Sequence, residues 1–253
     1  MRFPVPPAPF SGESRALPTQ AALDWLLQGW VLFRQAAGRW ALLAIFFLAL
    51  CVAPAALDAR ALWGMPLLLP FFAAGWFTIC RMESEAEKTA EEAEGAKGEK
   101  GKGRRFLPGD LFAGFVSPAL FIPGLLTLVM VHLPLACGAL FFHFAPFSPD
   151  AILNRVLGFC MLLPILFLLC LPLSMALLFA PPLMHQHRLP SLMALKASYI
   201  ACRKNLAPLF CLAFLSSLIA FATLLSAGLL LPLALPVAFG TWYAAYRDIF
   251  VSV

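Results

Sequence analysis

Forty consecutive residues near the C-terminal end of the chain, 206–245, carry no charged side chain. As a single α-helix, at 1.5 Å per residue, this run would be about 60 Å long. The hydrocarbon core of a bilayer is only about 30 Å thick, so the run predicts two membrane spans joined by a tight turn. The turn is expected at the Ser226-Ala227-Gly228 step, with Pro232 shortly beyond it.

The composition of the whole chain also indicates a membrane protein. Apolar residues make up 62% of the 253 residues and charged residues only 12%, whereas soluble domains have about 45–50% and about 25%. A soluble fold of this size could not cover so much apolar surface. We therefore expect an all-α membrane protein, because helices satisfy their own backbone hydrogen bonds in lipid.

Apolar stretches of about 20 residues predict six transmembrane helices in one membrane domain, residues 19–253, after a Pro-rich tail at 1–18. Between the second and third spans, residues 83–103 contain mostly Glu, Lys, Ala and Gly. Such a segment cannot offset its ordering entropy by burial, so we expect a disordered loop on the cytoplasmic side. The predicted spans are 40–57, 62–80, 118–142, 157–180, 206–226 and 229–246.

The basic residues are distributed unevenly between the two sides of this topology. Sixteen of the 18 Lys and Arg residues fall on the side of the N-terminus, and only Arg60 and Arg155 fall on the other side. Because cytoplasmic loops are enriched in Lys and Arg, this distribution predicts that both termini are cytoplasmic. An aromatic belt at the same interface is expected from five tryptophans: Trp25, Trp30, Trp40, Trp76 and Trp242.

Two shorter segments are amphipathic and too polar to span a bilayer, so we expect them to lie in the membrane interface. They cover residues 19–35 and 191–205, and each ends in basic side chains. Lys196 and Arg203, seven residues apart, share the polar face of the second segment.

These two segments begin copies of a longer internal repeat. At an offset of 169, the first match aligns Gly29-Trp30-x-x-Phe33-Arg34-Gln35 with Ser198-Tyr199-x-x-Cys202-Arg203-Lys204. At an offset of 166, the second aligns Leu69-Pro70, Trp76-Phe77 and Cys80-Arg81 with Leu235-Pro236, Trp242-Tyr243 and Tyr246-Arg247. The predicted unit is an interfacial helix followed by a two-span hairpin, and two spans per unit make the repeat parallel. A degenerate middle copy is indicated by Leu171-Pro172 and Phe179, preceded by Leu111–Phe115.

Several of these motifs resemble an uncharacterised family of proteobacterial inner-membrane proteins. The resemblance is carried by the Gly29-Trp30-x-Leu32-Phe33 opening, the Pro70–Trp76 segment, the Ala201–Pro208 stretch and the closing Tyr243-Ala-Ala-Tyr-Arg-Asp-Ile-Phe250. More distantly, the chain is similar to the helical membrane domain attached to some glycerophosphodiester phosphodiesterases, although no phosphodiesterase domain is present in it. The resemblance implies a multi-pass fold in the bacterial inner membrane and no active site.

Catalysis is not expected from the residues inside the predicted spans. No Asp, Glu, Lys or Arg lies deep in a span, and intramembrane enzymes and ion-coupled transporters retain such groups. His132 is a possible polar intramembrane site, although a lone histidine is more often hydrogen-bonded structurally. We therefore predict no enzyme activity, no cofactor and no metal site. The expected function is to organise lipid or a membrane partner complex; the alternative is a transporter or permease for an apolar or lipid-like solute.

The net charge of +5 sits beside apolar spans, which favours contact with lipid over nucleic acid. Arginine binds phosphate or carboxylate through a planar fork that lysine lacks, and Asp248 is one expected carboxylate partner. Anchoring by the positive-inside rule alone also explains basic residues in these positions, so both interpretations stay open. The candidates for contacts with anionic headgroups or a partner protein are Arg34, Arg81, Lys196, Arg203, Lys204 and Arg247.

Overall fold

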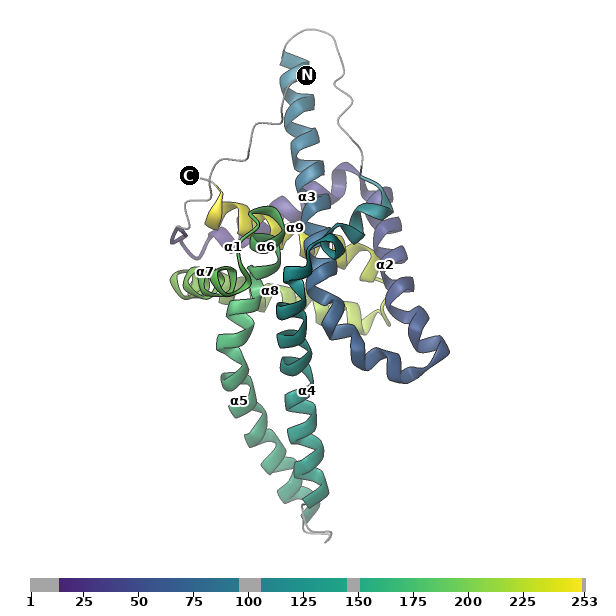
Figure 1. Cartoon of the computed structure of the whole chain (residues 1–253), viewed down its shortest axis with the longest axis vertical. Helices are drawn as coiled ribbons and strands as arrows, with labels where there is room; N and C mark the ends of the chain where they lie inside the picture. The colour runs from purple at the N-terminus through teal and green to yellow at the C-terminus, as the bar shows by residue number, and fades with distance from the viewer. Residues whose placement is uncertain (1–13, 96–105, 145–150, 252–253) are drawn as a thin grey trace.

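The computed structural model describes residues 14–95, 106–144 and 151–251 (Figure 1). Within these ranges the regular elements are helices, and no strand occurs. The α-helices are α1 (Ala21–Gln35), α2 (Ala37–Leu57), α3 (Met65–Gly95), α4 (Phe121–Phe144), α5 (Ala151–Leu178), α6 (Ala180–Gln186), α7 (Ser191–Lys204), α8 (Leu206–Leu225) and α9 (Leu231–Phe250). Three 3₁₀ helices join them: η1 (Ala59–Gly64), η2 (Pro108–Val116) and η3 (Pro118–Leu120).

Five stretches of the described chain are long and apolar enough to cross a membrane, so the protein is an all-helical, multi-pass membrane protein. They are Ala37–Pro54, Ala59–Ala86, Pro118–Phe141, Cys160–Gln186 and Leu206–Leu225. The predicted sixth span corresponds to α9, which is not among them. The second half of α9 carries Thr241, Arg247 and Asp248, and these side chains lower its mean hydropathy. The six-span topology stays a prediction.

The charge-free run 206–245 folds back at the predicted step. Helix α8 ends at Leu225, and Ala227 and Gly228 adopt positive φ angles of 50° and 85°. The backbone N–H of Gly228 donates to Thr223 O over 2.9 Å, which satisfies one carbonyl at the end of α8. Helix α9 begins three residues later with Pro232 in its first turn, where proline is well tolerated.

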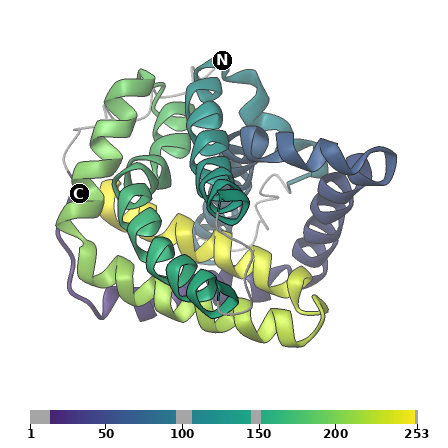
Figure 2. The same cartoon turned by 90° about the horizontal axis from the view of Figure 1, so that it is seen from below.

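Three short helices each pack against a longer helix. Helix α1 packs along α9, η2 packs along α3, and α7 packs along α5. In Figures 1 and 2, α3, α4 and α5 run along the long axis of the molecule, while α1 and α7 lie across it. The hairpin of α8 and α9 also extends across the direction of α4 and α5. Helices α4 and α5 and the hairpin of α8 and α9 therefore extend in different directions from a shared core, which lies at the level of α1, α6 and α7.

Small residues allow the close approach at each crossing. A side chain on Gly29 of α1 would meet the backbone of α9 at Val237 and Thr241. At the crossing of η2 and α3, a side chain on Gly114 would meet the carbonyl of Phe71. At the crossing of α7 and α5, the Ser198 hydroxyl donates to Met175 O over 2.7 Å.

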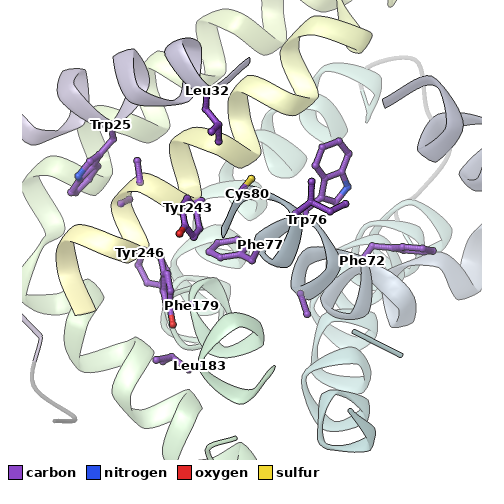
Figure 3. Packing of buried hydrophobic residues seen from close by; sticks show 14 of the residues in the cluster. Trp25, Leu32, Phe72, Trp76, Phe77, Cys80, Phe179, Leu183, Tyr243 and Tyr246 are labelled. Atoms are coloured by element: carbon purple, nitrogen blue, oxygen red, sulfur yellow. The ribbon is translucent and has the colours of Figure 1, made fainter. Parts of the chain in front are cut away.

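An aromatic core joins the crossings (Figure 3). Phe77 of α3 and Phe179, which precedes α6, both lie against Tyr246 of α9, with ring centroids 5.5 Å and 6.4 Å away. Trp25, Trp40 and Trp76, three members of the predicted interfacial belt, are buried by protein instead. Trp76 stacks between Trp40 and Phe239, at 6.1 Å and 4.7 Å. These three rings therefore pack against other helices and not against lipid.

The prediction of a disordered loop at 83–103 is wrong for residues 83–95, which continue α3 as a helix; residues 96–105 lie outside the described chain. Glu83 and Ser84 are buried. The Glu83 carboxylate accepts a hydrogen bond from Arg39 at the start of α2, over 2.9 Å. The ion pair between α2 and α3 therefore holds in place the first turn of a segment that its composition predicted to be disordered.

Residues 14–17 tie the end of α7 to the end of α9. Asn205, fully buried at the break between α7 and α8, donates from Nδ2 to Arg15 O over 2.7 Å and accepts at Oδ1 from Leu17 N over 2.9 Å. Arg15 N donates to Ile249 O over 3.0 Å. Thus part of the predicted Pro-rich tail is packed against the membrane domain.

Candidate functional site

Three ion pairs of the described chain lie near the region where α1 and α9 contact α3. Arg39 pairs with Glu83 at 2.9 Å, Arg81 with Glu85 at 3.4 Å, and Arg247 with Asp248 at 3.8 Å. By contrast, η1, which joins the far ends of α2 and α3, carries Asp58 and Arg60 with exposed side chains. Two of the predicted basic candidates, Arg81 and Arg247, take part in the ion pairs of this charged end.

Arg247 is held between α1 and its own helix. Its Nη2 donates to Gln28 Oε1 over 2.7 Å, and its Nε lies 3.8 Å from Asp248 Oδ1. The other carboxylate oxygen of Asp248 accepts from the Trp25 indole N–H over 3.0 Å. The expected partnership of Arg247 with Asp248 is therefore present in the structure, and Trp25 fixes the carboxylate in place.

Arg81, the residue matched to Arg247 in the predicted repeat, is more exposed. Its Nε lies 3.4 Å from Glu85, one helical turn further along α3. Exposed pairs of this kind contribute about 0.3–0.5 kcal/mol. Burial, together with the positive charge of Arg81, lowers the pKa of His187 below its ordinary value. His187 is therefore expected to be neutral at neutral pH.

The basic residues at the ends of α1 and α7, and Lys196 within α7, are exposed on the surface of the protein. Arg34 and Lys196 are exposed. The Arg203 guanidinium lies 5.9 Å from the ring centre of Tyr199, at the limit of a cation–π contact. Lys204 donates from Nζ to Ser14 O over 3.2 Å. The structure thus brings Arg247 into a packed environment and leaves Arg34, Lys196 and Arg203 on the surface.

His132 lies half-buried in α4, away from the charged end. Its Nδ1 is 2.8 Å from Leu128 O of the same helix, and its ring lies 5.1 Å from the ring of Trp63 in η1. Both contacts are of the kind that accommodates a polar ring within a helix bundle. In the described chain, no group of three His, Cys, Asp or Glu side chains is placed to hold a metal ion.

Sequence reasoning missed two features of this end. The first is the pair formed by Arg39 and Glu83, with the Arg39 guanidinium 5.0 Å from the ring centre of Phe106. The second is a pocket of about 280 Å³ between α1 and α9, whose wall includes Gln28, Ser84 and Arg247. The offset match had marked Arg247, but nothing in the sequence pairs it with Gln28, 219 residues away. Comparison of the chain with protein-family models, with characterised proteins and with solved structures finds no match.

Proposed function

We propose that this protein is a non-catalytic component of the bacterial inner membrane that organises anionic lipid at its cytoplasmic end. The observation that carries the proposal is the set of exposed basic side chains at the ends of α1 and α7 and within α3: Arg34, Arg203 and Arg81. Basic side chains at an interface attract anionic headgroups by about 1 kcal/mol each. Helices α1 and α7, which lie across the long helices, would place these charges in the headgroup layer.

The proposed architecture is a parallel repeat of three units, each with a short interfacial helix and a two-helix hairpin. Two breaks support it: one residue, Ala36, separates α1 from α2, and one residue, Asn205, separates α7 from α8, at the same offset of 169. The crossings support it as well. Gly29 approaches Val237, and Gly114 approaches Phe71, the residue matched to Val237 at an offset of 166. In this proposal the three units close into a ring, and each short helix packs on the hairpin of the preceding unit.

The proposed topology predicts where fused reporters will lie. Reporters inserted near Gly95 or fused after Val253 should be cytoplasmic, and reporters near Ala59 or Pro149 should be periplasmic, because basic residues are retained in the cytoplasm. A dual alkaline phosphatase and green fluorescent protein reporter measures both sides. A periplasmic signal at Val253 alone would mean that α9 does not span, which gives five spans. A periplasmic signal at Gly95 would reverse the proposed orientation.

If the arginines bind lipid phosphate, replacing them by lysine should reduce the retention of anionic lipid even though the charge is unchanged. In the double variant Arg34→Lys/Arg203→Lys the charge is unchanged, but the planar fork that binds phosphate bidentately is lost. We expect the ratio of phosphatidylglycerol to phosphatidylethanolamine around the protein to fall several-fold. Lipid mass spectrometry of polymer-extracted nanodiscs measures this ratio.

The matched control is Arg60→Lys, at the opposite end of the hairpin formed by α2 and α3. It should leave the lipid ratio unchanged. If the double variant retains the same lipids as the wild type, the arginines serve only to orient the chain, and the lipid function is wrong.

A second candidate function is the passage of an apolar or lipid-like solute, and one observation favours it. A groove of about 470 Å³ lies between α8 and α9, lined by small and apolar side chains that include Ala220, Thr223, Ala234 and Ala238. Such a lining suits an acyl chain rather than a polar solute. Movement of a fluorescent lipid between the leaflets of vesicles that contain the protein would favour this function over lipid organisation.

A further inference from the structure

The pocket between α1 and α9 has a more polar lining than the groove between α8 and α9. It has a volume of about 280 Å³ and lies where Gly240 of α9 approaches Gly29 of α1. Ser84 of α3 closes one side of it. Pockets for drug-sized molecules have volumes of about 300–1,000 Å³. This pocket therefore suits a small polar group and not a whole lipid.

The wall of the pocket has the chemistry of an anion site. Arg247 is the only charged residue among the described residues that line it; Asp248 does not line it. Gln28 uses its side-chain oxygen to accept from Arg247, so it offers a ligand its amide nitrogen, which is a donor. The hydroxyl-bearing residues Ser84 and Tyr243 complete the polar lining. The guanidinium of Arg247 can bind phosphate through its planar fork, and Asp248, 3.8 Å from its Nε, balances part of its charge.

The arginine is also pre-oriented. Trp25 holds Asp248, and Asp248 lies beside the Nε edge of Arg247, while Gln28 holds Nη2. A side chain that is already fixed loses little rotamer entropy when a ligand binds. The same contacts keep Arg247 about two-thirds buried, where its interaction with an anion is screened less than at an open surface.

Apolar side chains next to the pocket indicate the chemistry of the part of a bound molecule that would extend outside it. Leu27 and Val31, one turn apart on α1, line the pocket and are 61% and 49% exposed. An inorganic phosphate would leave these side chains uncovered, whereas the glycerol and acyl chains of a lipid would cover them. We propose that this pocket binds the phosphate group of an anionic phospholipid, with Arg247 as its charged partner and Gln28, Ser84 and Tyr243 as hydrogen-bonding neighbours. This site rests on the proposed lipid function and names one residue set for it.

Gln28→Glu tests the site without removing a helix contact. The new carboxylate accepts from Arg247 in a stronger, charge-assisted bond, so the fold is retained, but its charge repels a phosphate. The purified full chain in neutral detergent is titrated with short-chain phosphatidylglycerol, phosphatidylcholine or inorganic phosphate, and the melting temperature is followed. We expect phosphatidylglycerol to raise the melting temperature of the wild type, and Gln28→Glu and Arg247→Gln to weaken its binding at least tenfold. Arg60→Gln, which makes the same charge change outside the pocket, should bind as the wild type does.

Three outcomes would overturn parts of the inference. If both pocket variants bind phosphatidylglycerol as the wild type does, the pocket is not the site, although the lipid function can stand. If inorganic phosphate stabilises the wild type as much as phosphatidylglycerol, the occupant is a free anion and the lipid assignment is wrong. If phosphatidylglycerol and phosphatidylcholine act equally on the wild type, the site and the proposed function both fail.

Discussion

Gly75→Ala is expected to destabilise the protein by about 2 kcal/mol, although alanine is the better helix former. A Cβ at residue 75 of α3 would meet the backbone carbonyl of Leu111 in η2. A backbone atom cannot turn aside as a flexible side chain can, so the two helices must separate. Overpacking of this kind costs about 1–3 kcal/mol and occasionally more, which exceeds the gain of about 1 kcal/mol in helix propensity. Unfolding by SDS in mixed micelles, followed by circular dichroism, measures the change.

Gly38→Ala is the matched control. Gly38 lies near the start of α2, and a Cβ there meets nothing within 4 Å. The same substitution should therefore stabilise the protein slightly, through helix propensity alone. Opposite signs at the two positions are the expected result. Equal small effects at both would mean that η2 does not pack closely on α3.

Glu83→Gln is expected to destabilise the protein by about 1–3 kcal/mol. The Glu83 side chain is only 10% exposed, and its carboxylate accepts from Arg39 over 2.9 Å. Removing one partner of a buried pair leaves the other charge poorly solvated, which costs about 3–5 kcal/mol. Because Arg39 is 37% exposed, water screens part of this loss and the lower range applies. The same SDS titration measures the difference.

Glu85→Gln provides a comparison two residues away. Its pair with Arg81 is 3.4 Å long, and the Glu85 side chain is 65% exposed. Exposed pairs within a helix contribute about 0.3–0.5 kcal/mol, so the change in stability should be small. If Glu83→Gln has no greater effect than Glu85→Gln, then α2 and α3 are not held together by the pair of Arg39 and Glu83.

Hydropathy predicted most of the helical pattern, because lipid imposes simple rules on length and charge. The length of the run predicted that it folds back, and the Ser226-Ala227-Gly228 step with Pro232 beyond it predicted where the turn lies. The failure at residues 83–95 has a physical reason. Low apolar content excludes a hydrophobic core, but Ala, Glu and Lys are strong helix formers. A helix that is already anchored at Cys80 needs no new nucleation to continue through them.

The candidate site was predictable in part. The offset match drew attention to Arg247 because an aromatic pair precedes the arginine in both copies, Trp76-Phe77 in one and Trp242-Tyr243 in the other. What the sequence could not provide was the neighbour across the pocket. Gln28 is an ordinary polar residue on the predicted polar face of α1, and its role depends on how α1 crosses α9. Crossings between distant helices depend on small residues such as Gly29 and Gly240, and one sequence does not reveal which small residues meet.

The packing of α1 on α9 has a consequence for the order of events during synthesis. Helix α1 is made before α9, and the described helices α2 to α8 lie between them in the sequence. The contact of Gly29 with α9 therefore has a very long sequence separation, which slows its formation relative to local helix pairs. The hairpins can insert one after another, as domains fold during translation. The pocket between α1 and α9, which requires both helices, can only assemble after α9 has been made.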